Sequence, residues 1–188
     1  LQIISIELDA DDDAQLIFES LNSTGLALTE ADKIRNYLLM SLTAEEQQLC
    51  FKNYWQKIET ATENNPTKFL RDYLTIKQQL QRPVRLSNIY FEWKKYMDGR
   101  DRKQEMVEML DYARYYQQVT EAQMETSKLS AKMRHICNIE SDVTNVFFIQ
   151  FLKYAATNNL SYDEIDKVID VVENYLARRI ICNMPGNA

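Results

Sequence analysis

An acidic run near the start of the chain is the first set of side chains whose types could carry chemistry. Asp9, Asp11, Asp12 and Asp13 supply the carboxylate oxygens that divalent cations prefer. However, the Gly and terminal Glu of a calcium-binding loop do not follow at the required spacing. Carboxylates at the start of a helix also complement the positive end of its dipole. We therefore interpret the run as a helix cap and predict no metal site.

Histidine and cysteine, the side chains most used for acid–base and nucleophilic chemistry, are scarce. His135 is the single histidine, and it lies in the string MRHICNIE without a second ligand beside it. Cys50, Cys137 and Cys182 are widely spaced and form no CxxC pair, which argues against a zinc site or a disulfide framework. The sequence also has no Walker-type phosphate loop. We predict reduced cysteines, a cytoplasmic location and no catalytic residue in this chain.

A basic and aromatic segment, residues 66–103, is the third set. It holds ten Lys or Arg and four acids, whereas residues 1–32 hold eight acids and no Lys or Arg, in a chain of net charge −6. Cations neutralise phosphates regardless of base sequence, and aromatic rings stack on exposed bases. An ordinary solvated helix with an aromatic core face, here Tyr73, Tyr90, Trp93 and Tyr96, is the alternative interpretation. The candidate DNA-contact residues are Lys68, Arg71, Arg82, Arg85, Lys94, Lys95, Arg100, Arg102 and Lys103.

The elements that position these residues are predicted to be helices. Three Gly and three Pro in 188 residues are few, and this low frequency of chain breakers favours long helices over β sandwiches or barrels. Apolar periodicity and start signals predict helices over 12–21, 30–42, 44–62, 66–80, 87–98, 102–122, 128–140, 142–158 and 162–182. No apolar run reaches the roughly 20 residues that span a bilayer. We therefore predict a mainly α fold, a multi-helix bundle without a membrane segment.

One short strand is predicted before the first helix. In residues 2–8, QIISIEL, the side chains of Ile4, Ile6 and Leu8 lie on one face at a period of two. A single strand cannot bury itself, so it must pair with a sheet supplied by missing sequence or by another chain. We therefore expect this strand to be left over from a sheet that the chain does not contain.

Several helix starts and two apolar patterns are specific enough to be checked. Pro66 occupies the first position of its helix, and three starts have the spacing of a capping box: Thr29 with Asp32, Thr43 with Glu46, and Ser161 with Glu164. Residues 146–152, VFFIQFL, are apolar nearly all round and predict a central helix or, as the alternative, a buried strand. The last helix carries one apolar stripe, made of Ile165, Val168, Ile169, Val172, Tyr175, Leu176 and Ile180.

A polar connector joins the first two predicted helices. In LNSTGLALTEAD, residues 21–32, Asn22 ends one helix, Gly25 supplies a position without a Cβ restriction, and Thr29 starts the next helix. Spacing alone predicts a helix C-cap and a tight helix–loop–helix connection.

Two stretches of the sequence, one that includes this connector and one near the end of the chain, resemble a known protein family. Residues 18–36, FESLNSTGLALTEADKIRN, resemble the motif FexLNxTGxxLtxaDxirN of the GmrSD-type restriction family. Residues 173–182, ENYLARRIIC, are similar to the helix that closes the same region in that family. The resemblance covers the two ends of the chain, and the middle resembles the family only in being helical.

The resemblance implies a modification-dependent defence protein that hydrolyses a nucleoside triphosphate and cuts foreign, chemically modified DNA. In that family the first motif follows a ParB-like nucleotide-binding domain, and the closing helix precedes an HNH-type nuclease domain. Their signatures, Asp-Gly-Gln-Gln-Arg and a His-containing motif, are both missing here. Asp98-Gly99-Arg100 is the nearest string to the first, but it lacks both Gln residues and is typical of a turn.

From these observations we expect residues 1–42 to end a ParB-like domain and residues 43–188 to form a helical bundle domain. The expected function is a helical scaffold that couples a nucleotide-binding domain to a nuclease domain and contacts DNA, with those domains and DNA as partners. No cofactor is expected in this chain, whereas the parent protein is expected to use a nucleoside triphosphate and a divalent metal. The alternatives are an NTPase site completed in trans and a generic helical interaction module. The candidate interface or nucleotide-proximal residues, for which capping and packing is the alternative role, are Asn22, Thr24, Gly25, Asp32 and Arg35.

Overall fold

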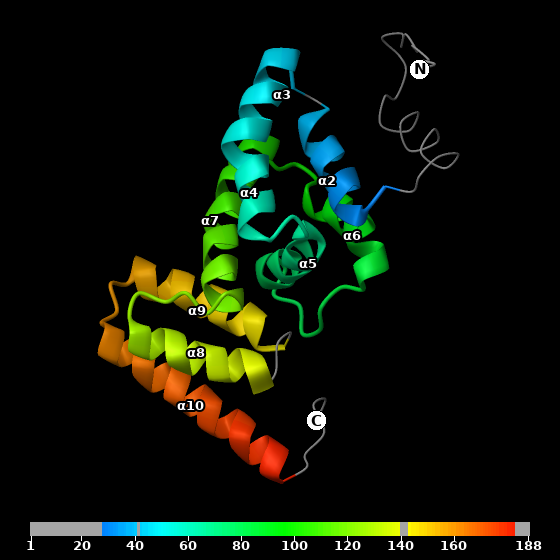
Figure 1. Ribbon diagram of the computed structural model, residues 1–188. Helices are drawn as coiled ribbons and strands as arrows, with labels where there is room; N and C mark the ends of the chain where they lie inside the picture. Colours follow the sequence, from blue (N-terminus) through cyan, green and yellow to red (C-terminus); the bar gives the residue numbers. More distant parts are fainter. Residues whose placement is uncertain (1–27, 41, 140–142, 183–188) are drawn as a thin grey trace, which may run out of the picture.

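The structure is a computed structural model that describes residues 28–40, 42–139 and 143–182. Throughout these residues the ordered elements are helices (Figure 1). They are α2 (Glu30–Leu39), α3 (Ala44–Cys50), η1 (Phe51–Trp55), α4 (Gln56–Ala61), α5 (Pro66–Lys77), η2 (Leu86–Asn88), α6 (Ile89–Tyr96), α7 (Arg102–Thr120), α8 (Ser127–Ile139), α9 (Val143–Thr157) and α10 (Tyr162–Ile181). The mainly α fold is confirmed, and each predicted helix from residue 30 onward is present. The predicted strand over 2–8, the helix over 12–21 and the acidic run lie outside the described residues.

The predicted helix starts are present with their side-chain caps. The hydroxyls of Thr29, Thr43 and Ser161 each accept a hydrogen bond from the backbone N–H three residues on, and the acid at that position bonds back. The returning bonds from Thr43 and Ser161 hold the pKa of the Glu46 and Glu164 carboxyls below their usual value. Local sequence therefore sets these boundaries, because each cap satisfies N–H groups that the helix itself leaves free.

The helix predicted over 44–62 contains a segment that the pattern does not reveal. Residues Phe51–Trp55 form a π-helical turn, η1, between α3 and α4. The indole of Trp55, which is 1% exposed, lies in the core at the end of this turn. A π turn inserts an extra residue per turn, so it rotates the following side chains relative to a regular α-helix.

The larger part of the core surrounds α5. Figure 1 shows α5 in the middle, with α7 and α6 on opposite sides of it, α2 above and α9 below, and α5 packs on all four. Its side chains Phe69, Leu70, Tyr73 and Leu74 are all buried. Helix α2 contributes Ala31, Ile34 and Leu38 to the same core and packs on α5, α6 and α7. The domain boundary predicted at residue 42 remains a prediction, because residues 1–27 are not described.

Helices α8, α9 and α10 form a second layer below this core (Figure 1). The segment predicted as a central helix or a buried strand is the helix α9, which packs on α5 and α7 and buries Phe148, Ile149 and Leu152. Its other face is open, since Phe147 is 46% exposed. The all-round apolar pattern is thus that of a helix that packs on the core through one face and leaves apolar side chains of another face exposed. Among the described residues, no helix is both long and apolar enough to cross a membrane.

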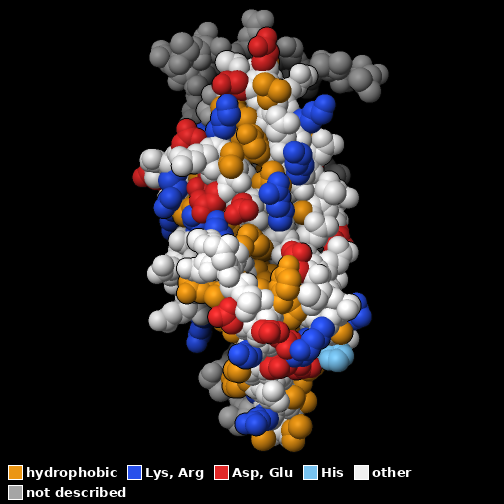
Figure 2. All heavy atoms as spheres, turned by 90° about the vertical axis from the view of Figure 1, so that its left-hand side faces the viewer, with side chains coloured by type: hydrophobic (Ala, Val, Ile, Leu, Met, Phe, Trp, Pro, Cys, Tyr) orange, Lys and Arg blue, Asp and Glu red, His pale blue; other side chains and the backbone are white. Residues whose placement is uncertain are grey.

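Helix α10 packs against α8 through the predicted apolar stripe and a set of ion pairs. Ile165, Ile169 and Leu176 are buried, whereas Tyr175 and Ile180 near the end are exposed, because α10 has 20 residues and α8 only 13. Lys128 and Lys132 of α8 both pair with Asp166 at 2.6 Å. Figure 2 shows basic and acidic side chains interleaved toward this lower end, with hydrophobic side chains gathered at its extremity.

Candidate functional site at the motif helix

Helix α2 carries the described part of the motif, and its first turn is closed by local hydrogen bonds. The Thr29 hydroxyl oxygen accepts from the Asp32 backbone N–H at 3.1 Å. In return, Asp32 Oδ2 accepts from the Thr29 backbone N–H at 3.2 Å and from the Thr29 hydroxyl at 2.7 Å. Glu30 accepts from the Tyr90 backbone N–H at 2.9 Å, at the start of α6. The start of α2 is thereby fixed both locally and against α6.

Arg35 connects α2 to α4. Its guanidinium lies 2.9 Å from Asp32 Oδ1 and 3.3 Å from Glu59 Oε1 of α4. The same Glu59 oxygen accepts from the Trp55 indole N–H at 2.6 Å. The Arg35 and Glu59 side chains are about a quarter exposed, at 28% and 24%. A charge-assisted bond of this kind, shielded in part from water, is stronger than a fully exposed ion pair.

We refer to the linked side chains of Asp32, Arg35, Glu59 and Trp55 as the α2 anchor. Two of its members, Asp32 and Arg35, are predicted site residues, whereas Glu59 and Trp55 were missed. The spacing of Trp55 and Glu59 by four residues is the signal that places them on one helix face, but no local pattern indicates that Arg35 reaches them. The other predicted motif residues, Asn22, Thr24 and Gly25, lie outside the described residues.

Several of the candidate DNA-contact cations are engaged inside the molecule. Arg71 pairs with the buried Asp72 at 2.9 Å, and Arg102 donates to the Tyr37 carbonyl oxygen at 2.8 Å while its guanidinium covers the Tyr37 ring. Arg100 donates to the Tyr96 carbonyl oxygen at 2.9 Å. Arg102 thus links α7 to α2, whereas Arg71 and Arg100 bond locally, and the charge of all three is partly committed within the fold.

The remaining cations of the segment are exposed, but they do not form one compact patch. Arg82 and Arg85 lie in the connection between α5 and α6 and make no ion pair with a described residue. Lys95 pairs with Glu92 at 3.3 Å and lies over the Phe91 ring. Lys68 and Lys94 are exposed on α5 and α6, and Lys103 is exposed near the start of α7. Arg82, Arg85, Lys94 and Lys95 therefore lie on the surface of α6 and of the connection before it, whereas Lys68 and Lys103 lie on α5 and α7.

The aromatic residues of the segment lie in the core, as the alternative interpretation expects. Tyr73 and Trp93 are at most 1% exposed, and the ring of Tyr73 contacts those of Trp93 and Tyr112. The hydroxyls of Tyr73 and Tyr96 both donate to Oε1 of Glu105, the second at 2.8 Å. The Glu105 side chain, in the first turn of α7, is itself buried. These rings are therefore not available to stack on bases, and Glu105 is a buried polar residue that the sequence pattern did not reveal.

Other candidates from the sequence have ordinary structural roles. His135 is exposed on α8, with Nδ1 3.1 Å from Glu173 Oε1 of α10. Asp98-Gly99-Arg100 forms the predicted turn after α6, and Gly99 has a φ of 70°, which favours glycine. Cys50, Cys137 and Cys182 are free thiols. Within the described ranges, no group of three or more His, Cys, Asp or Glu side chains is placed to hold a metal ion.

Comparison of the chain with protein-family models, with curated proteins and with solved structures finds no match. The geometry of the described residues is therefore the observation that bears on function. Its main feature at the motif is the α2 anchor, which holds a helix in place and does not converge on a reacting centre.

Proposed function

We propose that this chain is the helical connector of a GmrSD-type modification-dependent restriction protein, joining a ParB-like nucleotide-binding domain to a nuclease domain. The observation that carries the proposal is the α2 anchor. It links two residues of the family-like motif, Asp32 and Arg35, to the body of the bundle through Glu59. The described part of the motif, residues 28–36, thus lies at the N-terminal end of the described bundle, and from that end a neighbouring domain would act on it.

The packing of α7 supplies a physical route for coupling. Its start contacts α2, and its other end contacts α8 and α9, so the helix runs from one layer to the other (Figure 1). With 19 residues it spans about 28 Å at 1.5 Å per residue. Packed helices move as rigid bodies, since interiors are too dense to deform continuously. A displacement of α2 would therefore be passed to the layer that contains α10.

The restriction function is tested with the full-length protein from which this chain derives. Expressed in a sensitive host, it is expected to lower the plating of a phage with modified bases and to spare a matched phage with unmodified DNA. Arg35→Ala is expected to weaken this restriction while nucleotide hydrolysis continues, because it breaks the link from α2 to Glu59. Lys33→Ala, which removes only an ion pair with Glu30 within α2, is the control and should restrict normally.

Equal plating of the two phages by the wild-type protein would contradict the proposed function. So would a reading frame that lacks Asp-Gly-Gln-Gln-Arg upstream of this chain. If the wild type restricts but Arg35→Ala restricts equally well, the α2 anchor is not the coupling element. Binding of labelled GTP or ATP by this chain alone would instead favour the NTPase alternative.

DNA contact is the second part of the proposal, and the exposed cations around α6 support it. Arg82→Glu with Arg85→Glu, and separately Lys94→Glu with Lys95→Glu, are expected to weaken DNA binding by this chain. Each pair should also lower the slope of log affinity against log salt by about 2, since each lost phosphate contact removes roughly one released counterion. Fluorescence anisotropy with a labelled duplex at several salt concentrations measures both quantities.

A matched charge control separates local contact from general repulsion. Lys52→Glu with Lys57→Glu makes the same change of net charge at two exposed positions of η1 and α4, outside the basic segment. This variant should retain the wild-type salt slope. If all three double variants had the same slope of log affinity against log salt, the proposed DNA-contact surface would be contradicted.

A further inference from the structure

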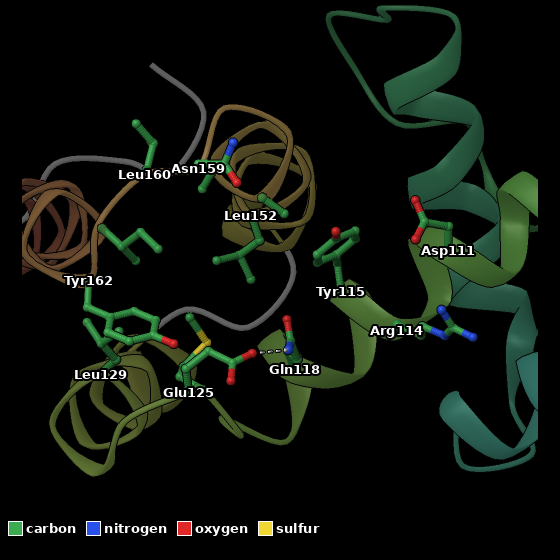
Figure 3. Close-up of a pocket in the computed structure, with 14 residues that line it drawn as sticks. Asp111, Arg114, Tyr115, Gln118, Glu125, Leu129, Leu152, Asn159, Leu160 and Tyr162 are labelled. Carbon is green, nitrogen blue, oxygen red and sulfur yellow. Dashed lines mark hydrogen bonds between the residues drawn. The ribbon is translucent and has the colours of Figure 1, made fainter.

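An open groove lies between the two layers, away from the motif helix. It is bounded by α7, α8, the end of α9 and the start of α10, and it has a volume of about 460 Å³ (Figure 3). The buried side chains Leu129, Leu152 and Ile165 form an apolar floor. A volume of this size is in the range of small-molecule sites, which are typically concave, mostly apolar and lined by a few polar groups.

Two tyrosines form facing walls of the groove. Figure 3 shows Tyr115 of α7 on one side and Tyr162 of α10 on the other, with the Tyr162 hydroxyl directed toward Glu125. Tyr162 is 53% exposed, although it belongs to a residue type that usually buries its ring. Tyr115 is half-buried, and this burial raises the pKa of its hydroxyl, so the hydroxyl is neutral at physiological pH. Aromatic rings in this position offer negative faces to a cation.

The charge directed at the groove is negative. Glu125 lies in the connection between α7 and α8, and its carboxylate accepts only from the Gln118 amide at 3.3 Å among the described residues. Asp111, also at the rim, is already paired with Lys153 at 3.3 Å. Figure 3 shows Arg114 extending away from Tyr162 and Glu125. Glu125 is therefore the carboxylate at this groove without a cationic partner in the described structure.

We propose that the groove binds a small amphipathic organic cation, with an aromatic or branched hydrocarbon body and one ammonium group. The body covers the floor of Leu129, Leu152 and Ile165. The ammonium group is bound by Glu125 and by the face of Tyr162. A carboxylate or phosphate ligand would be repelled by Glu125, and a purely apolar ligand would leave Glu125 without a cationic partner. This site is independent of the proposed function, because none of its residues belongs to the motif or to the basic segment.

The test titrates this chain with three probes that differ mainly in the charge of the head group: 2-phenylethylammonium, 2-phenylethanol and 3-phenylpropanoate. Backbone chemical shifts in NMR spectra report where and how tightly each binds. The ammonium is expected to bind at the groove about tenfold more tightly than the alcohol, a difference of about 1.4 kcal/mol. The propanoate is expected to cause no saturable shift.

Matched variants assign the binding to its groups. Glu125→Gln should weaken the ammonium about tenfold, to the level of the alcohol, and leave the alcohol unchanged. Glu121→Gln removes a nearby carboxylate that is bonded to Gln117 and does not line the groove, so it should bind all probes as the wild type does. Ala156→Trp fills the groove from an exposed position and should abolish binding of both ligands.

Equal affinity of the ammonium and the alcohol in the wild type would overturn the proposal. An unchanged ammonium affinity in Glu125→Gln, or in an Ala156→Trp variant whose circular dichroism spectrum is native, would do so as well. The absence of saturable shifts with the ammonium would also overturn it. None of these results bears on restriction or DNA binding, which are measured separately.

Discussion

Replacing Glu105 by Ala is expected to lower the free energy of unfolding by about 2–6 kcal/mol, because two buried hydroxyls lose their shared acceptor. The hydroxyls of Tyr73 and Tyr96 both donate to Glu105 Oε1, and all three side chains are less than 9% exposed. A buried donor left without a partner costs about 1–3 kcal/mol. Urea denaturation followed by tryptophan fluorescence measures the change, since Trp93 lies next to both tyrosine rings.

Two variants test whether the loss of stability comes from removing the hydrogen-bond acceptor, Glu105 Oε1. Glu105→Gln keeps an oxygen at the position of Oε1, so it should lose substantially less stability than Glu105→Ala. Glu108→Ala, one turn further along α7, removes a partly exposed carboxylate that pairs with Lys77 at 2.6 Å and should cost about 1 kcal/mol or less. If Glu105→Ala and Glu108→Ala were equally stable, the buried bonds would not stabilise the core.

The Glu105 site shows what a sequence pattern can and cannot indicate. Tyr73, Trp93 and Tyr96 are correctly predicted as an aromatic core face in one of the two interpretations. Glu105 was not predicted, since an acid in the first turn of a helix is normally explained by the helix dipole and by solvent. Its burial depends on Tyr73 of α5 and Tyr96 of α6. Local sequence does not predict that these two helices bring their tyrosines to Glu105.

The same distinction between local features, which the sequence predicts, and contacts between helices, which it does not, applies to the fold. Capping boxes such as Thr29 with Asp32 act within four residues, so their spacing predicts the helix starts correctly. The π-helical turn at Phe51–Trp55 and the free end of α10 depend on which helices meet, so periodicity does not reveal them. For the same reason the sequence placed Arg35 in a candidate surface but did not indicate its partner Glu59. The groove likewise combines four elements and has no sequence signature.

Alkaline pH is expected to lower the stability of the protein through the same buried cluster. Burial, with the added effect of the Glu105 carboxylate, raises the pKa of Tyr73 far above its ordinary value, and burial and the bond to Glu105 also raise the pKa of Tyr96. Above about pH 10, Tyr73 in the unfolded chain loses its proton, whereas Tyr73 in the folded chain keeps it. The unfolded state then binds fewer protons, so the unfolding free energy falls as the pH rises.

For Tyr73 alone, with an unfolded-state pKa of about 10, the expected loss approaches about 1.4 kcal/mol per pH unit and reaches about 2.3 kcal/mol between pH 10 and pH 12. The decline continues until the pH reaches the folded-state pKa, and it becomes negligible below about pH 9, where Tyr73 is protonated in both states. Tyr73→Phe should therefore be less stable than the wild type at pH 7, since it loses a hydrogen bond, yet lose less stability between pH 10 and pH 12. Tyr175→Phe, which removes a hydroxyl from a residue that is 61% exposed, should follow the wild-type profile. Parallel wild-type and Tyr73→Phe profiles from urea denaturation at each pH would show that this buried proton does not control alkaline stability.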